Sequence, residues 1–273
     1  MNARSKSITA IVVIAAIAYI AYRLFAHSSH LLTPAILTPQ MDAHRALSPE
    51  IGARIDRLLN DHIEYSRADR PRLIALTFDD GPYPVFTPLL LDQLHDLHVP
   101  ATFFLIGRDA QQYPELTKRI EAAGNEIADH TYTHPNLDQE TPAEVKGEIL
   151  KGRDALDQLA PDPGIDTLMR PPHGRFTEQT VRVAQKLGYQ VILWTDDGGD
   201  WRSVTAAALA SHLEDHATAP EIVLLHSGKL ATIQMLPQVV ARFRRAGYQF
   251  LTVSQLLARV PAAQINHPAR RQV

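Results

Sequence analysis

The chain contains no cysteine among its 273 residues. Disulfide bonds and thiolate metal ligands are therefore excluded, and the absence is compatible with an oxidising or a reducing compartment. Charge of one dominant sign is also missing, since the formal net charge is −3 at pH 7 and acidic and basic residues are interspersed. This balance gives no reason to expect a nucleic acid or an anionic membrane surface as a partner.

Long hydrophobic runs are scarce, and the one that stands out covers residues 8–22, after Arg4 and Lys6. Together with the apolar residues beyond Arg23, about 19 residues would form ~28 Å of helix, close to the ~30 Å of a hydrocarbon core. The pattern predicts an uncleaved signal anchor over residues 1–27, so that the protein crosses the membrane once. A signal peptide cleaved near Ala26 is the alternative, and both place the following residues outside the cytoplasm, in the periplasm or at the cell surface.

The remainder of the chain divides into three parts. Residues 28–71 are expected to be a linker with an accessory helix, which Ser48 would cap and Pro49 would begin. Residues 72–258 form the predicted main domain, and residues 259–273 a flexible tail.

Within the main domain, short apolar runs alternate with amphipathic segments, which predicts an α/β fold with parallel strands and right-handed crossovers. Seven strands suggest a barrel, and an open doubly wound sheet is the alternative. Strands are expected at residues 73–78, 102–106, 126–128, 167–169, 190–194, 222–225 and 250–253. Helices are expected at residues 85–97, 113–123, 142–159, 178–187, 204–217 and 230–246.

Two adjacent carboxylates, Asp79 and Asp80, stand at the end of the first predicted strand and precede Gly81-Pro82. Neighbouring carboxylates repel one another and are costly to bury unless a cation or a proton lies between them. Taken alone, the motif is also compatible with a surface turn.

His130 and His134 follow the third predicted strand, four residues apart. A helical turn or a tight loop can direct both imidazoles to one point, as metal binding requires. With Asp80 or Asp79 they would form a set of two histidines and a carboxylate, which leaves coordination positions for water and substrate.

Three more strand ends carry polar residues: Arg170, the acidic segment from Asp196 to Asp200, and His226. Because parallel strands end at the same edge of a sheet, these residues are expected to meet Asp79 and His130 there.

These motifs, in this order and spacing, resemble the polysaccharide deacetylase family (the NodB homology domain, carbohydrate esterase family 4). The resemblance covers about residues 72–257. It is carried by Thr77-Phe78-Asp79-Asp80-Gly81-Pro82, His130-Thr131-Tyr132-Thr133-His134, Arg170-Pro171-Pro172-His173-Gly174, Asp197-Gly198-Gly199-Asp200-Trp201 and Leu224-Leu225-His226. It implies a distorted (β/α)7 barrel and a metal-dependent hydrolase that removes acetyl groups from an N-acetylhexosamine polymer.

The resemblance also implies roles for the acids and the first histidines. Asp80, His130 and His134 would hold a divalent metal, usually zinc, with cobalt, manganese or nickel also suited to such ligands. Asp79 would be the general base, and Arg170 would orient it.

On the opposite side of the site, His226 would be the general acid that protonates the leaving amine. Asp200 would raise the pKa of His226, and Asp197 could share or replace Asp200 in this role.

The substrate would meet the backbone N–H of His173 as an oxyanion donor, and Trp201 and Leu224 as walls of the acetyl pocket. Two positions depart from the family pattern. His173 stands where tyrosine is usual, and Ser227, where an acid is common, is expected to loosen the loop after His226.

The sequence leaves the substrate open among peptidoglycan, poly-N-acetylglucosamine and chitin oligomers. No carbohydrate-binding or peptidoglycan-binding repeat is recognisable. Alternatives are O-deacetylation of a polysaccharide, amide hydrolysis of a small non-sugar substrate, and a catalytically silent glycan-binding module.

Overall fold

The computed structural model describes residues 71–160, 162–217 and 219–260. All of them belong to one compact unit, residues 43–273. The predicted anchor, the accessory helix and the tail beyond residue 260 lie outside the described residues. In the described part, no helix is both long enough and apolar enough to cross a membrane.

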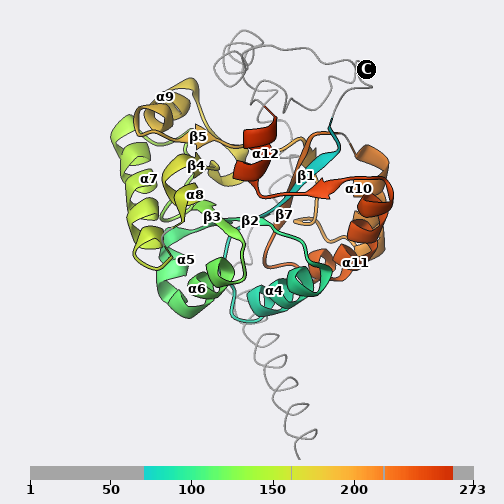
Figure 1. Ribbon diagram of the computed structural model, residues 1–273. Coiled ribbons are helices and arrows are strands. Elements are labelled where there is room, and N and C mark those ends of the chain that lie inside the picture. The colour runs from blue at the N-terminus through green and yellow to red at the C-terminus, as the bar shows by residue number, and fades with distance from the viewer. Residues whose placement is uncertain (1–70, 161, 218, 261–273) are drawn as a thin grey trace, which may run out of the picture. The chain divides into compact units, whose positions relative to one another are not determined.

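The core of this unit is a parallel sheet of eight strands (Figure 1). In sequence order the strands are β1 (Leu73–Asp79), β2 (Thr102–Leu105), β3 (Glu126–Asp129), β4 (Leu168–Met169), β5 (Gln190–Val191), β6 (Asp196–Asp197), β7 (Glu221–His226) and β8 (Gln249–Phe250). Their spatial order is β5-β4-β3-β2-β1-β7-β6, and β8 pairs with the beginning of β1. The sheet is a curled half-barrel, since no ladder joins β5 to β6 among the described residues.

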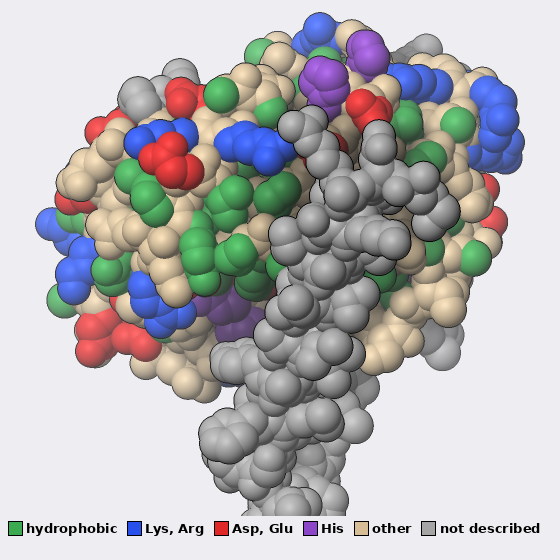
Figure 2. Space-filling view, turned by 90° about the horizontal axis from the view of Figure 1, so that it is seen from below, with side chains coloured by type: hydrophobic (Ala, Val, Ile, Leu, Met, Phe, Trp, Pro, Cys, Tyr) green, Lys and Arg blue, Asp and Glu red, His purple; other side chains and the backbone are tan. Residues whose placement is uncertain are grey.

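Helices surround the sheet, with α7 and α9 on one side and α4, α10 and α11 on the other (Figure 1). They are α4 (Phe86–Leu97), α5 (Gly107–Gln112), α6 (Pro114–Ala122), α7 (Pro142–Asp157), α8 (Pro163–Thr167), the 3₁₀ turn η2 (Pro172–Gly174), α9 (Glu178–Lys186), α10 (Ala206–His216), α11 (Leu230–Arg245) and α12 (Val253–Arg259). The face shown in Figure 2 carries Lys and Arg side chains interspersed with Asp and Glu.

Alternate residues of the strands enter two separate apolar clusters. In β1, Ile74, Leu76 and Phe78 pack toward the outer helices, while Leu73 and Ala75 face the inside of the curled sheet. This division follows from the two-residue period of a β-strand. Asp79 lies four residues after Ala75 in the same strand, so its side chain also faces the inside of the curled sheet.

The observed helices and strands differ from the sequence-based expectations at several places. The described residues contain eight strands where seven were expected, because β6 forms within the acidic segment and pairs with β7. The fifth strand ends at Val191, and the last is β8, which ends at Phe250 because Thr252 caps α12. The helices α5, α8 and α12 were not predicted.

Candidate metal and acid–base site

Asp79 and Asp80 diverge because the chain turns between them. Asp79 is the last residue of β1 and is 4 % exposed. Asp80 has a φ of 69°, in the left-handed region that few non-glycine residues adopt. This turn gives the two carboxylates different main partners, although one oxygen of each lies 3.8 Å from His130 Nε2.

His130 and His134 lie in the loop that follows β3, and their rings are 4.8 Å apart between centroids. The Nδ1 of His130 contacts the backbone oxygen of Arg170 at 2.8 Å. When Nδ1 donates to this oxygen, Nε2 is left as the ligand nitrogen, an arrangement common in metal-binding histidines. Burial, with a smaller effect from the His134 charge, lowers the pKa of His130 to about 3, which keeps its imidazole neutral and ready to bind a metal.

The two imidazoles converge on Asp80. His134 Nε2 lies 3.3 Å and His130 Nε2 3.8 Å from Asp80 Oδ1, and the three ligand atoms lie within 4.8 Å of one another. In a tetrahedral zinc site, ligand atoms ~2.0–2.2 Å from the metal are about 3.3–3.6 Å apart. The donor set and its spacing therefore fit a divalent metal, and the carboxylate of this candidate set is that of Asp80.

Arg170 holds the other carboxylate. Its guanidinium is fully buried and donates to Asp79 Oδ1 at 2.6 Å and to Thr77 Oγ1 at 2.7 Å. It also packs over the ring of Phe104, 4.0 Å from the ring centroid. Burial raises the pKa of Asp79, and the charge of Arg170 opposes that rise. Asp79 Oδ2 lies 3.8 Å from His130 Nε2 and so faces the candidate metal position.

His226, at the end of β7, is paired with Asp200. Its Nδ1 lies 2.7 Å from Asp200 Oδ1, and its backbone N–H donates to Asp200 Oδ2 at 2.7 Å. Burial alone would lower the pKa of His226, but the hydrogen bond and charge of Asp200, with the charges of Asp79 and Asp80, raise it to about 9. His226 is therefore protonated at neutral pH, and Nε2 is the nitrogen left to face the site.

Asp197 contacts a different partner. Its carboxylate accepts from the indole Nε1 of Trp201 at 3.3 Å and from the backbone N–H of Gly199 at 2.9 Å. The guanidinium of Arg202 lies over the Trp201 ring, 4.6 Å from the centroid. Thus Asp200 alone of these two acids contacts His226, and Asp197 orients Trp201.

Two predicted site residues remain: His173, which lies beside His134, and Leu224, which lies on β7. His173 is exposed and has a φ of 57°, and its ring packs against His134 with centroids 4.5 Å apart. Its Nδ1 contacts Asn136 Oδ1 at 2.9 Å. Leu224 is 5 % exposed on β7, two residues before His226 and thus on the same face of the strand.

Three residues in this site were missed or misread in the sequence. Thr77 supports Arg170, and Thr232 Oγ1 donates to Asp200 Oδ2 at 2.5 Å. Ser227 was expected to loosen its loop, but its hydroxyl lies 3.1 Å from the backbone oxygen of Asp79 and 3.0 Å from that of Asp80. A polar residue on an otherwise apolar strand or helix face is the signal that could have identified both threonines.

Comparison with known proteins shows which protein family this chain resembles. Residues 66–192 match the family model described as polysaccharide deacetylase. A peptidoglycan-N-acetylglucosamine deacetylase of Bacillus cereus is 33 % identical over 201 residues, which cover 72 % of this chain and 93 % of that protein. A chitooligosaccharide deacetylase of a Bradyrhizobium species is 34 % identical over 206 residues, covering 70 % of this chain and 94 % of the relative.

A crystal structure of a carbohydrate esterase family 4 pseudoenzyme from Bacillus anthracis has a similar fold, with a TM-score of 0.65 and 26 % identity, over 68 % of this chain and 66 % of that one. A similar fold therefore does not by itself establish catalysis, which depends on the residues of the site. With its motifs and relatives in agreement, the chain belongs to the polysaccharide deacetylase family.

Proposed function

We propose that this protein is a metal-dependent N-deacetylase that hydrolyses acetamide groups of an N-acetylhexosamine polysaccharide outside the cytoplasm. The observation that carries the proposal is the position of Asp79, which combines contact with Arg170 at one oxygen and proximity to the Asp80–His130–His134 set at the other. A base beside a metal position, opposite a protonated histidine, is what hydrolysis of an amide needs.

A divalent metal held by Asp80, His130 and His134 would lower the pKa of water and polarise the acetamide carbonyl. Zinc is the first candidate, and cobalt, manganese and nickel suit the same ligands. In the reaction Asp79 takes the proton of the attacking water while Arg170 keeps its carboxylate in place. His226 Nε2 gives a proton to the amine nitrogen as the C–N bond breaks, so that acetate and a free amine leave.

Three further groups are proposed to meet the substrate. The backbone N–H of His173 would donate to the developing oxyanion, because preorganised donors stabilise charge that appears in the transition state. Trp201 and Leu224 would bound the acetyl methyl group and the sugar face. The hydrogen bond from Trp201 to Asp197 supports a fixed orientation of the indole.

Peptidoglycan and chitin oligomers are the substrates to test first, because the names of the two relatives point to these glycans. The hydrophobic run within residues 1–27 supports a membrane anchor that holds the domain in the periplasm or at the cell surface. Secretion after cleavage of the run is the alternative.

The test is acetate release by the full chain in detergent from purified peptidoglycan and from chitin oligomers. The protein would be treated with a chelator and then supplied with zinc or cobalt. Metal-dependent acetate is the expected result. Binding of metal without acetate from either glycan would reject the proposal in favour of an O-acetyl or non-sugar substrate, or of a silent glycan-binding module.

A further inference from the structure

The mechanism makes no use of Asp129, the last residue of β3, although it is fully buried next to a candidate metal ligand. Its Oδ1 accepts a hydrogen bond of 2.7 Å from the backbone N–H of Thr131. Its Oδ2 is buried and has no hydrogen-bond partner in the described part of the chain. A buried carboxylate is costly, so one placed here calls for a reason.

The loop that Asp129 supports has an unusual backbone. Thr131 has a φ of 67° and His134 a φ of 65°. A β-branched residue such as threonine rarely adopts a positive φ, and conformations of this kind persist only where their surroundings enforce them. The hydrogen bond from Thr131 N–H to the Asp129 side chain closes a tight turn around His130, and this turn holds Thr131 at its positive φ.

A second hydrogen bond extends this support to the other imidazole. Thr131 Oγ1 accepts from the backbone N–H of His134 at 3.2 Å, and the backbone oxygen of Thr131 accepts from Gly107 N at 3.0 Å. The hydrogen bonds therefore run from Asp129 through Thr131 to His134, and His130 lies between the first two residues. Both histidines depend on the conformation of this one turn.

Helix α7 packs directly behind the carboxylate. A Cβ added at Gly152 would collide with Asp129 Oδ1 and would lie 3.0 Å from the carbonyl carbon of Thr131. Gly147, on the same helix, has nothing within 4 Å of an added Cβ. The close approach at Gly152 thus confines the Asp129 carboxylate and the Thr131 backbone together.

We propose that Asp129 is a positioning residue for the metal centre. By holding Thr131 in its left-handed conformation, the carboxylate keeps the Nε2 atoms of His130 and His134 converged on Asp80. This assignment rests on the metal site of the proposed function, and it goes beyond that function because Asp129 touches neither metal nor substrate. A merely structural residue would stabilise the fold without affecting metal affinity.

The test measures the zinc Kd of the full chain by calorimetry, alongside its thermal midpoint without metal. Asp129→Ala is expected to weaken zinc binding by about 10–100-fold, the usual effect of losing a partner behind a ligand. Asp129→Asn keeps an oxygen that accepts from Thr131 N–H, so its Kd is expected to stay within about threefold of wild type.

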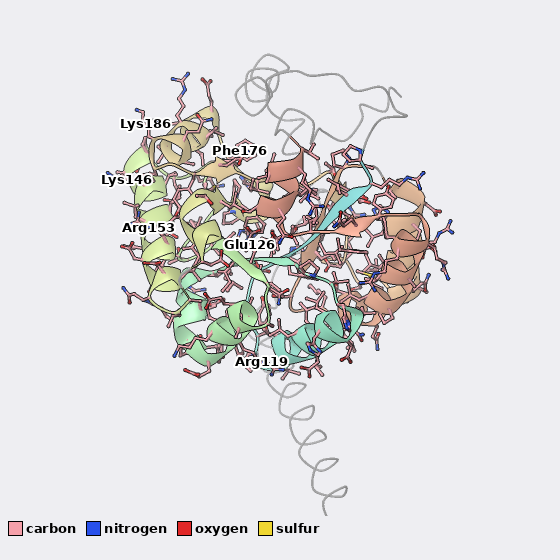
Figure 3. The ribbon with its side chains drawn as sticks, in the orientation of Figure 1. Arg119, Glu126, Lys146, Arg153, Phe176 and Lys186 are labelled. Atoms are coloured by element: carbon pink, nitrogen blue, oxygen red, sulfur yellow. The ribbon has the colours of Figure 1, made fainter. Side chains whose placement is uncertain are left out.

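Glu126→Gln is the matched control. Glu126 is also a buried acid of β3, but it lies at the opposite end of the strand, where it accepts from Thr102 Oγ1 at 2.7 Å and from Ser254 N at 3.3 Å. Figure 3 labels it in the middle of the sheet, away from the outer helices that carry Arg119 and Lys186. This variant is expected to lower the thermal midpoint and to leave the zinc Kd unchanged.

Gly152→Ala is a second substitution that perturbs the Asp129 carboxylate, and Gly147→Ala is its control. The first should displace Asp129 and weaken zinc binding, and the second should not. Wild-type zinc affinity in Asp129→Ala would overturn the proposal, as would an equal loss of affinity in Glu126→Gln. If the wild-type chain binds zinc and releases no acetate, the proposed function fails and the assignment of Asp129 stands.

Discussion

At the scale of single residues, the site separates four acids by their partners. Asp80 faces two imidazoles, Asp79 faces a guanidinium, Asp200 faces His226, and Asp197 faces an indole. Identical carboxylates thus acquire different chemistry from different partners, so substitution of each acid should give a distinct defect.

The neighbouring acids Asp79 and Asp80 provide the sharpest contrast. Asp79→Asn is expected to lower kcat by about 10²–10⁴-fold, the usual contribution of a general base. It should leave zinc affinity near wild type, because the amide can still contact Arg170 and the three ligands are intact. Asp80→Asn should instead weaken zinc binding itself. Calorimetry and acetate release on the same samples check both, and loss of zinc in Asp79→Asn would show that Asp79 is a ligand.

The pH dependence of activity tests the pair of His226 and Asp200. The pKa of His226 is raised to about 9, so the acid stays protonated below that pH and activity should fall as the pH rises through it. Asp200→Asn removes the largest of the contributions that raise this pKa, so the alkaline limb of kcat/KM should move to lower pH, toward the ordinary histidine value of about 6.5. Asp197→Asn, which leaves His226 untouched, should keep the wild-type limb. An unmoved limb in Asp200→Asn would remove His226 from the role of general acid.

At the scale of elements, the site depends on how β1 and β7 are joined. The two strands pair over six residues, which brings Asp79 opposite His226. Ser227 then ties the turn after β7 to the turn after β1, since its backbone N–H and its hydroxyl both contact Asp79 O. The base and the acid are therefore fixed relative to one another by backbone structure.

Ser227→Ala should loosen this connection. Asp79 O keeps the hydrogen bond from the Ser227 backbone N–H, so the loss is that of an ordinary hydrogen bond, about 0.5–1.5 kcal/mol. The free energy of unfolding, measured by denaturant titration, is expected to fall by that amount, and kcat should fall with it as Asp79 becomes less well held. Ser211→Ala, an exposed position on α10, is the control and should change neither quantity. Wild-type stability in Ser227→Ala would mean that the hydroxyl does not stabilise the contact between the turns after β1 and β7.

The elements also show what could be predicted from the sequence and what could not. β1, β3 and β7 each contain apolar residues and end in a polar one, namely Asp79, Asp129 (followed by His130) and His226, and these strands with their polar ends were predicted. The strand β6 has two residues, too few to produce a periodic signal, and β5 was predicted at residues 190–194 but has only two residues. The positions of Ser227 and Thr232 depend on contacts between distant segments, which a single sequence does not contain.

At the scale of the whole molecule, the candidate metal position joins β1 to the loop after β3, strands that are not neighbours because β2 lies between them. A metal bound there would link segments about 50 residues apart in the sequence. Because an unfolded chain does not preserve such a site, metal binding should stabilise the folded state.

Metal removal should therefore lower the thermal stability of the protein. Zinc at 100 times its Kd adds about 2.7 kcal/mol, which corresponds to roughly 5–11 °C for a domain of this size. A thermal scan of the full chain at fixed protein concentration, with chelator and then with excess zinc, measures the shift. His134→Ala removes a ligand whose side chain is 20 % exposed, so it should fold and show little or no shift. An equal shift in this variant would mean that zinc stabilises the protein at another place, and the assignment of the three ligands would then be wrong.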